Sequence, residues 1–270
     1  MAVSFGNVEE LITLINNVHG LDLGGYSRAS LKRRISRILA IYQIDFMALK
    51  DHLVNAPGFF NTFLIEVTVT VTAMFRDPAF YKALREEITP YLATFPHIKV
   101  WSAGCATGEE VYSLAILLAK RGLYNRTFIY GTDINAEVIE RAKQGIIDLK
   151  KMKIYSDNYL QTASDDSLSE YYTAKYDAAV FHHELRKNIL FSTHNLVSDG
   201  VFNEFHLITC RNVLIYFNTD LQRQVVGLCY ASLALFGFLC LGAKETLPPN
   251  GIKDKFRIIS KTHNIYQKIA

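Results

Sequence analysis

Segments with the pattern of strands and segments with the pattern of helices alternate through the middle of the chain. Apolar runs predict strands at residues 98–103 and 128–132, and helical periodicity predicts helices at 109–121 and 136–144. This order is typical of βαβ units, whose parallel strands form one sheet with helices packed on its faces. The chain is therefore predicted to contain an α/β domain, in which ligands bind at the carboxyl ends of the strands.

The turn after the first predicted strand holds two glycines and then two adjacent acids. Its sequence, GCATGEE, occupies residues 104–110. Glycines and the start of a helix let a ligand approach backbone N–H groups. The spacing differs from the GxGxxG of dinucleotide-binding turns, and the carboxylates of Glu109 and Glu110 would repel a phosphate. They would attract an ammonium or sulfonium group, both of which S-adenosylmethionine carries, unless they only stabilise the first helical turn.

The second predicted strand leads into Asp133. An acid at this position commonly accepts hydrogen bonds from the ribose hydroxyls of an adenosine. Gly104, Glu110 and Asp133 would then lie at one edge of the sheet. Together they predict a cofactor that contains a nucleoside.

Residues before about position 70 have helical periodicity. Apolar residues recur at helical spacing from Leu11 to Val18 and again from Leu31 to Leu39. The second of these helices also has a basic face, formed by Lys32, Arg33, Arg34 and Arg37. That face is either a solvated surface or a docking surface for an acidic partner. Nucleic acid is a weaker candidate, because no interleaved aromatic residues and no nucleic-acid-binding motif accompany the charges.

The junction between the helical region and the α/β region alternates Val and Thr from Val67 to Thr72. The alternation predicts a short strand or an extended connector. A helix is predicted to begin at Asp77-Pro78, because proline is favoured in a first helical turn. From periodicity alone, Thr72 and Arg76 fit a structural role better than a functional one.

The second half of the chain is less regular at first and then returns to strands. Residues from about 155 to 191, with Ile189 and Phe191 near the end, predict a small antiparallel appendage to the sheet. A buried strand follows from Phe205 to Thr209, and the C-terminal segments predict an antiparallel hairpin at the sheet edge.

No metal site or membrane span is predicted. His182 and His183 are adjacent, so on a strand their side chains would point to opposite faces. The four cysteines form no CxxC pair and no zinc spacing, which predicts reduced thiols in a cytoplasmic protein. No apolar run reaches the length that crosses a bilayer.

Five stretches in order along the chain together resemble the CheR family of chemoreceptor glutamate methyltransferases: SLKRRISRIL, VTVTAMFRDPAF, WSAGCATGEEVYSLA, TDIN and CRNVLIYF. The resemblance runs from about residue 9 to 268. It implies an α/β, Rossmann-like S-adenosylmethionine-dependent methyltransferase domain with an inserted small β-subdomain and an N-terminal all-α domain. The implied boundaries are 1–72 for the helical domain, 73–95 for a linker helix and 96–270 for the methyltransferase domain, with the insertion at about 155–191.

The resemblance also implies residue roles. Arg76 would hold the substrate carboxylate and Tyr216 would orient it. The implied cofactor-binding residues are Thr70, Thr72, Arg76, Gly104, Glu110, Asp133, Asn195, Leu196, Arg211 and Asn212. Three positions depart from the family pattern: Thr70 stands where Asn is usual, Met74 where Phe is usual, and Ala243 where His is common.

The implied activity is methyl transfer from S-adenosylmethionine to glutamate carboxylates of chemotaxis receptors, which leaves S-adenosylhomocysteine. The basic residues of the helical domain would then dock on the acidic helical bundle of a receptor. The glycine-rich loop linked in some relatives to binding a receptor C-terminal peptide is absent, so we expect no such tether, and we expect a monomer that binds no nucleic acid. A non-catalytic module that binds the same cofactor is the alternative. A nucleic-acid methyltransferase is disfavoured, because TCRNVLIYF lacks the Asp/Asn-Pro-Pro-aromatic motif.

Overall fold

The computed structural model describes residues 3–68, 72–162, 165–249 and 251–270. Four helices form the N-terminal part, as their periodicity predicts: α1 (Phe5–His19), α2 (Arg28–Tyr42), α3 (Phe46–Asn55) and α4 (Phe59–Thr68). Ser4 caps α1 by accepting a hydrogen bond from the Asn7 N–H, and Gly20 ends the helix in the left-handed conformation at φ 67°. Each helix turns its apolar stripe inward, as α2 does with Leu31, Ile35 and Ile38.

A seven-stranded sheet forms the second part, in the order β6-β2-β1-β7-β8-β10-β9. Its strands are β1 (Ile98–Ala103), β2 (Thr127–Asp133), β6 (Ile189–Thr193), β7 (Phe205–Cys210), β8 (Leu233–Leu241), β9 (Phe256–Ser260) and β10 (Ile265–Lys268). The first five are parallel, whereas β10 runs antiparallel to both β8 and β9. The predicted closing hairpin is therefore confirmed as β9–β10. The chain leaves β1 toward β2 and β6 and later returns on the other side to β7, so the strand order reverses between β1 and β7.

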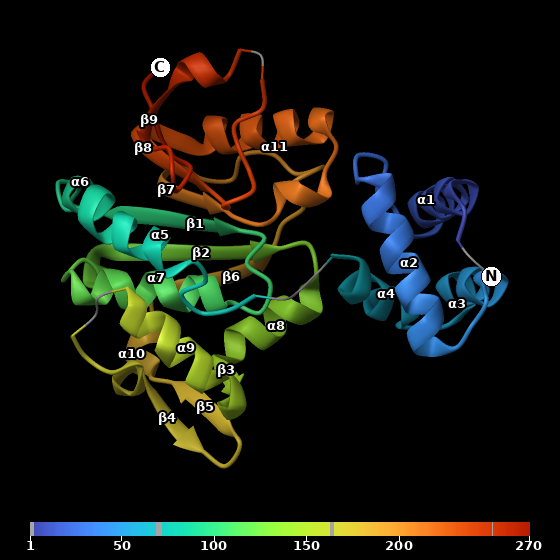
Figure 1. Ribbon diagram of the computed structural model, residues 1–270, viewed down its shortest axis with the longest axis horizontal. Coiled ribbons are helices and arrows are strands. Elements are labelled where there is room, and N and C mark those ends of the chain that lie inside the picture. Colours follow the sequence, from blue (N-terminus) through green and yellow to red (C-terminus); the bar gives the residue numbers. More distant parts are fainter. Residues whose placement is uncertain (1–2, 69–71, 163–164, 250) are drawn as a thin grey trace.

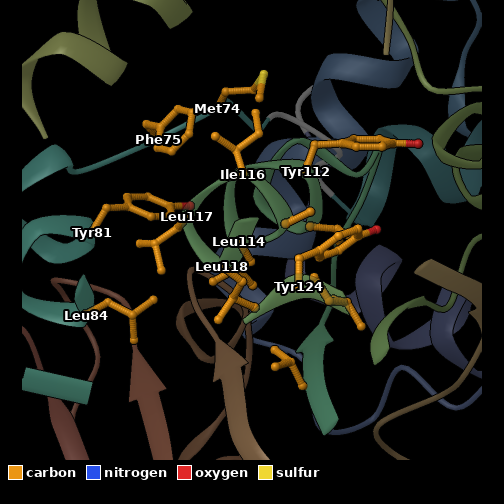
Figure 2. Packing of buried hydrophobic residues seen from close by; sticks show 14 of the residues in the cluster. Met74, Phe75, Tyr81, Leu84, Tyr112, Leu114, Ile116, Leu117, Leu118 and Tyr124 are labelled. Atoms are coloured by element: carbon orange, nitrogen blue, oxygen red, sulfur yellow. The ribbon is translucent and has the colours of Figure 1, made fainter. Parts of the chain in front are cut away.

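Helices cover both faces of this sheet (Figure 1). They are α5 (Pro78–Ala83), a π-helical turn η1 (Leu84–Ile88), α6 (Thr89–Leu92), α7 (Glu109–Lys120), α8 (Ala136–Gln144) and α11 (Thr219–Ser232). Side chains of β1 alternate between two cores: Val100 belongs to the core that contains residues of α5 and α7, and Trp101 to the core that contains residues of α11 and the N-terminal helices. Figure 2 shows the first of these cores around α7.

A separate small sheet, ordered β3-β5-β4, is inserted between β2 and β6. It contains β3 (Ile146–Asp148), β4 (Tyr172–Lys175) and β5 (Ala178–Phe181), with α9 (Leu149–Gln161) and α10 (His183–Arg186) beside it. An antiparallel appendage was expected, but its extent differs. It begins at Ile146 rather than near residue 155, because β3 pairs with β5. Ile189 and Phe191 lie in β6, which pairs in parallel with β2 in the main sheet.

The junction also differs in part from the expectation. Val67 and Thr68 are the last residues of α4, so their alternation does not form a strand. Thr70 and Val71 lie outside the described residues. Helix α5 begins at Pro78 as predicted, after a segment from Thr72 to Asp77, here called the strap.

The N-terminal helices lie beside the carboxyl ends of the parallel strands, where the arrows of β1 and β2 point in Figure 1. Direct contacts join the two parts: Tyr26 forms a β-bridge with Phe217, and the Ser27 N–H donates to the Tyr216 carbonyl at 2.8 Å. Within the described residues, no helix combines the length and apolar character needed to cross a membrane.

Candidate active site

Three loops meet at the carboxyl ends of β1, β2 and β7, where the strand order reverses. The loop after β1 makes two glycine turns, with φ 73° at Gly104 and 90° at Gly108. A Cβ on Gly104 would lie 2.5 Å from the Val213 side chain, and one on Gly108 would lie 3.0 Å from Ala142. Only glycine combines these φ values with such close neighbours. The loop backbone is therefore left bare toward the cleft.

Asp133, the last residue of β2, holds this loop. Its Oδ2 accepts a hydrogen bond from the Ala106 N–H at 2.9 Å, and its Oδ1 accepts one from the Asn135 N–H at 3.1 Å. Burial raises the pKa of the Asp133 carboxyl, although these backbone donors oppose the shift. Each oxygen keeps a further lone pair, so the carboxylate can still accept hydrogen bonds from a ligand's hydroxyls.

Asp133 lines a pocket of about 590 Å³, counting space open to the solvent, which we call the first lobe. Its other lining residues include Gly104, Ile134, His194, Asn195, Leu196, Asn212, Tyr216 and Phe217. Apolar walls with a few polar groups are typical of small-molecule sites. A purine nucleoside has this combination of flat apolar surface and polar edge.

A second lobe of about 480 Å³, again counting open space, adjoins the first. The two lobes share Gly104, Ala106, Asn212 and Tyr216. The second lobe adds the residues Thr72, Ala73, Arg76, Cys105, Glu110 and Arg211. It is the charged half of the cleft. Burial, together with the nearby Asp133 and Glu110 carboxylates, raises the pKa of the Cys105 thiol, so the thiol stays protonated.

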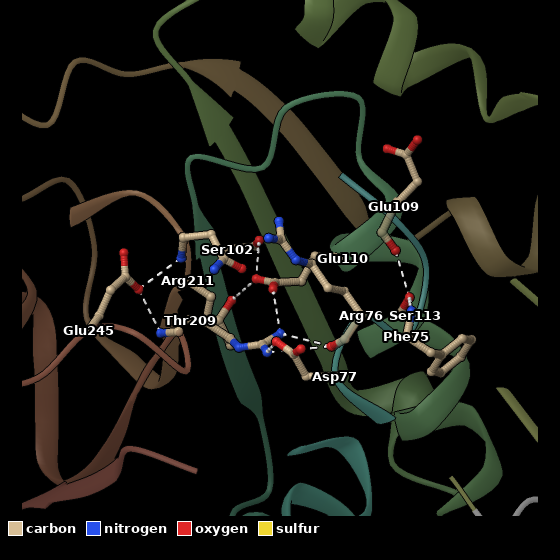
Figure 3. A network of polar contacts seen from close by, with 12 residues as sticks. Phe75, Arg76, Asp77, Ser102, Glu109, Glu110, Ser113, Thr209, Arg211 and Glu245 are labelled. Carbon is tan, nitrogen blue, oxygen red and sulfur yellow. Dashed lines mark hydrogen bonds and ion pairs between the residues drawn. The ribbon is translucent and has the colours of Figure 1, made fainter. Parts of the chain in front are cut away.

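Glu110 is the carboxylate that faces the second lobe. Its Oε1 accepts hydrogen bonds from Ser102 at 3.0 Å and Thr209 at 2.6 Å, and its Oε2 pairs with Arg211 at 3.2 Å (Figure 3). Ser102 and Thr209 are polar residues near the ends of two otherwise apolar strands, β1 and β7. A carboxylate has about four lone-pair sites, so roughly one on Oε2 remains for a cationic ligand group.

Arg211 is buried, with 2% of its side chain exposed, and supports its neighbours. Its Nη2 pairs with Asp77 at 2.8 Å, both Nη atoms contact the Arg76 carbonyl, and the guanidinium lies 3.9 Å from the centre of the Phe80 ring. Burial opposes the charge, but the Glu110, Tyr81 and Asp77 groups outweigh burial and raise the pKa of Arg211. The side chain is thus engaged with protein, and we interpret it as holding Glu110 and the strap in place.

Glu109 does not share the role of Glu110, contrary to the expectation of two carboxylates facing the ligand. Figure 3 shows its side chain pointing away from the Glu110 network. It accepts hydrogen bonds from Thr107 at 2.6 Å and Tyr155 at 3.4 Å, and burial raises its pKa. Successive residues at a helix start point about 100° apart, so adjacent acids cannot both face one lobe.

The strap carries Arg76 into the second lobe. Met74 and Phe75 anchor it in the core, where Met74 replaces the phenylalanine usual in the family without leaving the apolar interior. Phe75 and Asp77 have positive φ values of 51° and 62°, which are strained for these residues and concentrate at functional sites. Between them, the exposed Arg76 side chain extends toward Glu110 (Figure 3).

Tyr216 ends the short helical turn η4 (Leu214–Tyr216) and lines both lobes. Burial raises the pKa of its hydroxyl, and nearby Arg34 and Arg76 oppose that shift. The guanidinium of Arg34 lies 5.3 Å from the centre of the Tyr216 ring. A residue assigned to the docking face is therefore half-buried beside the active site.

The other predicted residues divide between the cleft and the surface. Asn195, Leu196 and Asn212 line the first lobe, and Thr72 lines the second, whereas Thr70 lies outside the described residues. Lys32 lies over the Phe5 ring at 4.7 Å, and Arg37 is 3.8 Å from Glu66. Arg33 and Arg37 are exposed on α2.

Glu245 is a site residue that the sequence analysis missed. It is 4% exposed, and its carboxylate accepts hydrogen bonds from the N–H groups of Asn212 at 2.8 Å, Gly242 at 2.6 Å and Ile215 at 3.2 Å. It thereby fixes the turn after β7 to the end of β8. The sequence signal that could have indicated this role is the position of Glu245, an acid shortly after the end of the buried parallel strand β8. Ala243, which replaces a histidine of the family, is exposed and takes no part in this network.

Glu245→Ala is expected to lower stability by about 1–3 kcal/mol, because one buried and two partly buried N–H groups lose their acceptor. The melting temperature should fall by roughly 3–10 °C. Thermal unfolding of Glu245→Ala and of a control variant, Glu204→Ala, which removes an exposed glutamate, measures the fall in melting temperature. Equal melting temperatures for the two variants would show that the turn does not depend on Glu245.

The donors and acceptors of the two lobes fit S-adenosylmethionine. The first lobe offers a buried carboxylate for ribose hydroxyls beside apolar walls, and the second offers an unfilled acceptor position on Glu110 for an ammonium group. Bare backbone at Gly104 joins the two lobes. Within the described residues, no group of three or more His, Cys, Asp or Glu side chains is arranged to hold a metal ion.

Comparison with known proteins gives a consistent result. A family model described as the SAM binding domain of CheR methyltransferase matches residues 70–265, and one described as its all-alpha domain matches residues 7–68. Cher3 of Pseudomonas putida is 46% identical over 96% of this chain and 95% of its own length. A chemotaxis protein methyltransferase of Listeria monocytogenes is 32% identical over 84% and 85% of the two chains, and one of Vibrio cholerae is 27% identical over 93% and 92%.

Proposed function

Because this chain belongs to the CheR family of S-adenosylmethionine-dependent methyltransferases, we propose that it methylates glutamate side chains of chemotaxis receptors. The product would be a glutamate methyl ester. The observation that carries the proposal is the pair of adjoining lobes. One is suited to an adenosine, and the other brings Glu110 and Arg76 into the same small space.

The chemistry requires little proton transfer. The cofactor supplies an electrophilic methyl group on a sulfonium. A glutamate carboxylate is already ionised near neutral pH, so no general base is needed to activate it. The protein's part is to bind, orient and desolvate the carboxylate.

Arg76 is the residue we assign to the substrate carboxylate, through a charge-assisted hydrogen bond. Its side chain is exposed in the second lobe, and among the described residues its carbonyl makes the contact that supports the fold, with Arg211. Tyr216 lines both lobes, and we assign its protonated hydroxyl to orienting the same carboxylate. Asp133 and Glu110 are assigned to the cofactor.

The basic face of α2 is the proposed docking surface for the acidic helical bundle of a receptor. Arg33 and Arg37 are exposed there, and Lys32 is half-exposed. Arg34 is turned toward Tyr216, so we assign it to the part of the receptor nearest the methylated glutamate. The two surfaces of opposite charge would meet beside the mouth of the cleft.

Arg33→Glu with Arg37→Glu is expected to raise KM for a receptor fragment about tenfold, because two attractive charges become repulsive. The Kd of S-adenosylhomocysteine should stay unchanged, since neither residue lines a lobe. Initial rates at two salt concentrations measure KM, and calorimetry measures the Kd of S-adenosylhomocysteine. Unchanged KM at low salt would remove α2 from the docking surface.

Recognition is proposed to be independent of a receptor C-terminal peptide, with a monomeric enzyme acting in the cytoplasm. The β4–β5 turn passes through Tyr176 and Asp177 and contains no glycine. All four cysteines are buried and free, as in proteins of reducing compartments. Comparing the methylation of receptors with and without their C-terminal residues tests whether recognition is independent of that peptide.

Transfer of labelled methyl groups to a receptor fragment tests the function itself. We expect incorporation that is released as methanol by mild base, as methyl esters are, and that disappears when the receptor glutamates are replaced by alanine. Base-stable incorporation would overturn the proposal. Cofactor binding without transfer to any receptor would instead favour the non-catalytic module.

A further inference from the structure

Two residues of the N-terminal helical part, Tyr26 and Thr68, line the first lobe, and Tyr26 is the one beside Asp133 that carries an aromatic hydroxyl. Tyr26 lies between α1 and α2, is 8% exposed, and lines the lobe together with Asp133 and Ile134. Apart from Thr70, which lies outside the described residues, the other assigned cofactor residues lie in the strap or in the methyltransferase domain. A cofactor in the first lobe would therefore contact both parts of the protein.

Contacts from both sides fix the position of the Tyr26 ring. The ring packs edge-on against Phe217, with centroids 5.0 Å apart, and the two residues form a β-bridge. The Asn218 N–H also donates to the Gly25 carbonyl at 2.9 Å, and a Cβ on Gly25 would lie 2.6 Å from Leu221. The close approach of backbone to α11 needs glycine here, so the ring has little freedom to leave the lobe.

Among the residues that the structure describes, the Tyr26 hydroxyl makes no hydrogen bond, and it is not one of the buried polar atoms left without a partner, so it is accessible from the lobe. Burial, and secondarily the Asp133 carboxylate, raise the pKa of this hydroxyl, so it stays protonated and lies within electrostatic range of Asp133. A protonated phenol both donates and accepts hydrogen bonds. The hydroxyl faces the open lobe, so a polar ligand group beside Asp133 could replace water as its hydrogen-bond partner.

We propose that Tyr26 is a cofactor-binding residue whose hydroxyl hydrogen-bonds a ribose hydroxyl of the adenosine held by Asp133. The proposal rests on the assignment of the first lobe to adenosine and not on the identity of the methylated receptor. Helix α2 starts two residues after Tyr26. The bound cofactor therefore ties the docking helix to the methyltransferase domain.

Calorimetry with S-adenosylhomocysteine and its 2′-deoxy and 3′-deoxy analogues tests this contact without relying on turnover. Tyr26→Phe keeps the ring and removes only the hydroxyl, so the variant should fold as the wild type does. We expect it to bind S-adenosylhomocysteine about 3- to 10-fold more weakly. The analogue that lacks the contacted hydroxyl should bind wild type and Tyr26→Phe equally.

Tyr266→Phe is the matched control, since Tyr266 is also buried but lies in β10 and lines neither lobe. It should bind all three ligands as the wild type does. Equal binding of S-adenosylhomocysteine by wild type and Tyr26→Phe would overturn the inference. So would an equal loss for all three ligands, which would indicate only a structural role. Failure of the wild type to bind S-adenosylhomocysteine would instead overturn the cofactor site itself.

Discussion

Arg76→Ala is expected to lower kcat/KM for methyl transfer to a receptor fragment by about 100- to 1,000-fold. The variant loses the charge-assisted hydrogen bond that we assign to the substrate carboxylate, and a carboxylate held even about 1 Å out of line reacts roughly 100-fold more slowly. The protein should fold normally, because Arg211 contacts the Arg76 carbonyl and that carbonyl is unchanged. Initial rates with varied receptor concentration measure the effect.

Arg121→Ala provides the control, since it removes an exposed arginine at the end of α7. Arg76→Lys should recover only part of the rate, because an ammonium cannot hold a carboxylate with two parallel hydrogen bonds. If Arg76→Ala transfers methyl groups as fast as Arg121→Ala, Arg76 does not hold the substrate.

Glu110→Gln is expected to weaken S-adenosylhomocysteine binding roughly 10- to 100-fold, because the cofactor's ammonium loses a charged acceptor. Glu110→Ala goes further and leaves the buried Arg211 with Asp77 as its remaining carboxylate partner. Breaking a buried ion pair typically costs about 3–5 kcal/mol, so we expect the melting temperature to fall by roughly 6–15 °C. Calorimetry and thermal unfolding measure the two effects.

Glu109→Gln is the control for the glutamine variant, because Glu109 is adjacent in sequence but turned toward Thr107 and Tyr155. We expect it to bind S-adenosylhomocysteine nearly as tightly as the wild type. Similar losses for Glu109→Gln and Glu110→Gln would contradict the orientation of the two side chains. They would restore the simpler view in which both acids act on the ligand.

Much of the cleft could be predicted from sequence because parallel strands bring their ends together. Once strands were expected at residues 98–103 and 128–132, Gly104 and Asp133 had to lie near each other. Thr209 at the end of β7 and Arg211 just after it lie at the same edge of the sheet, and both contact Glu110. Local pattern and topology are sufficient for these positions.

The remaining features depend on contacts between distant segments. Periodicity does not show that Ile146 pairs with Val180, and so the start of the inserted sheet was placed too late. The direction of Glu109 depends on Tyr155, which comes from α9. Glu245 and Tyr26 act through backbone and ring contacts across loops, and no spacing in the sequence encodes those contacts.

A crystal structure with S-adenosylhomocysteine is the most direct test of the two-lobed cleft. We predict that the ribose lies against Asp133 in the first lobe, and that the amino group lies against Glu110 in the second, within reach of Arg76. A ligand bound elsewhere, or bound with its adenosine beside Glu110, would contradict the account.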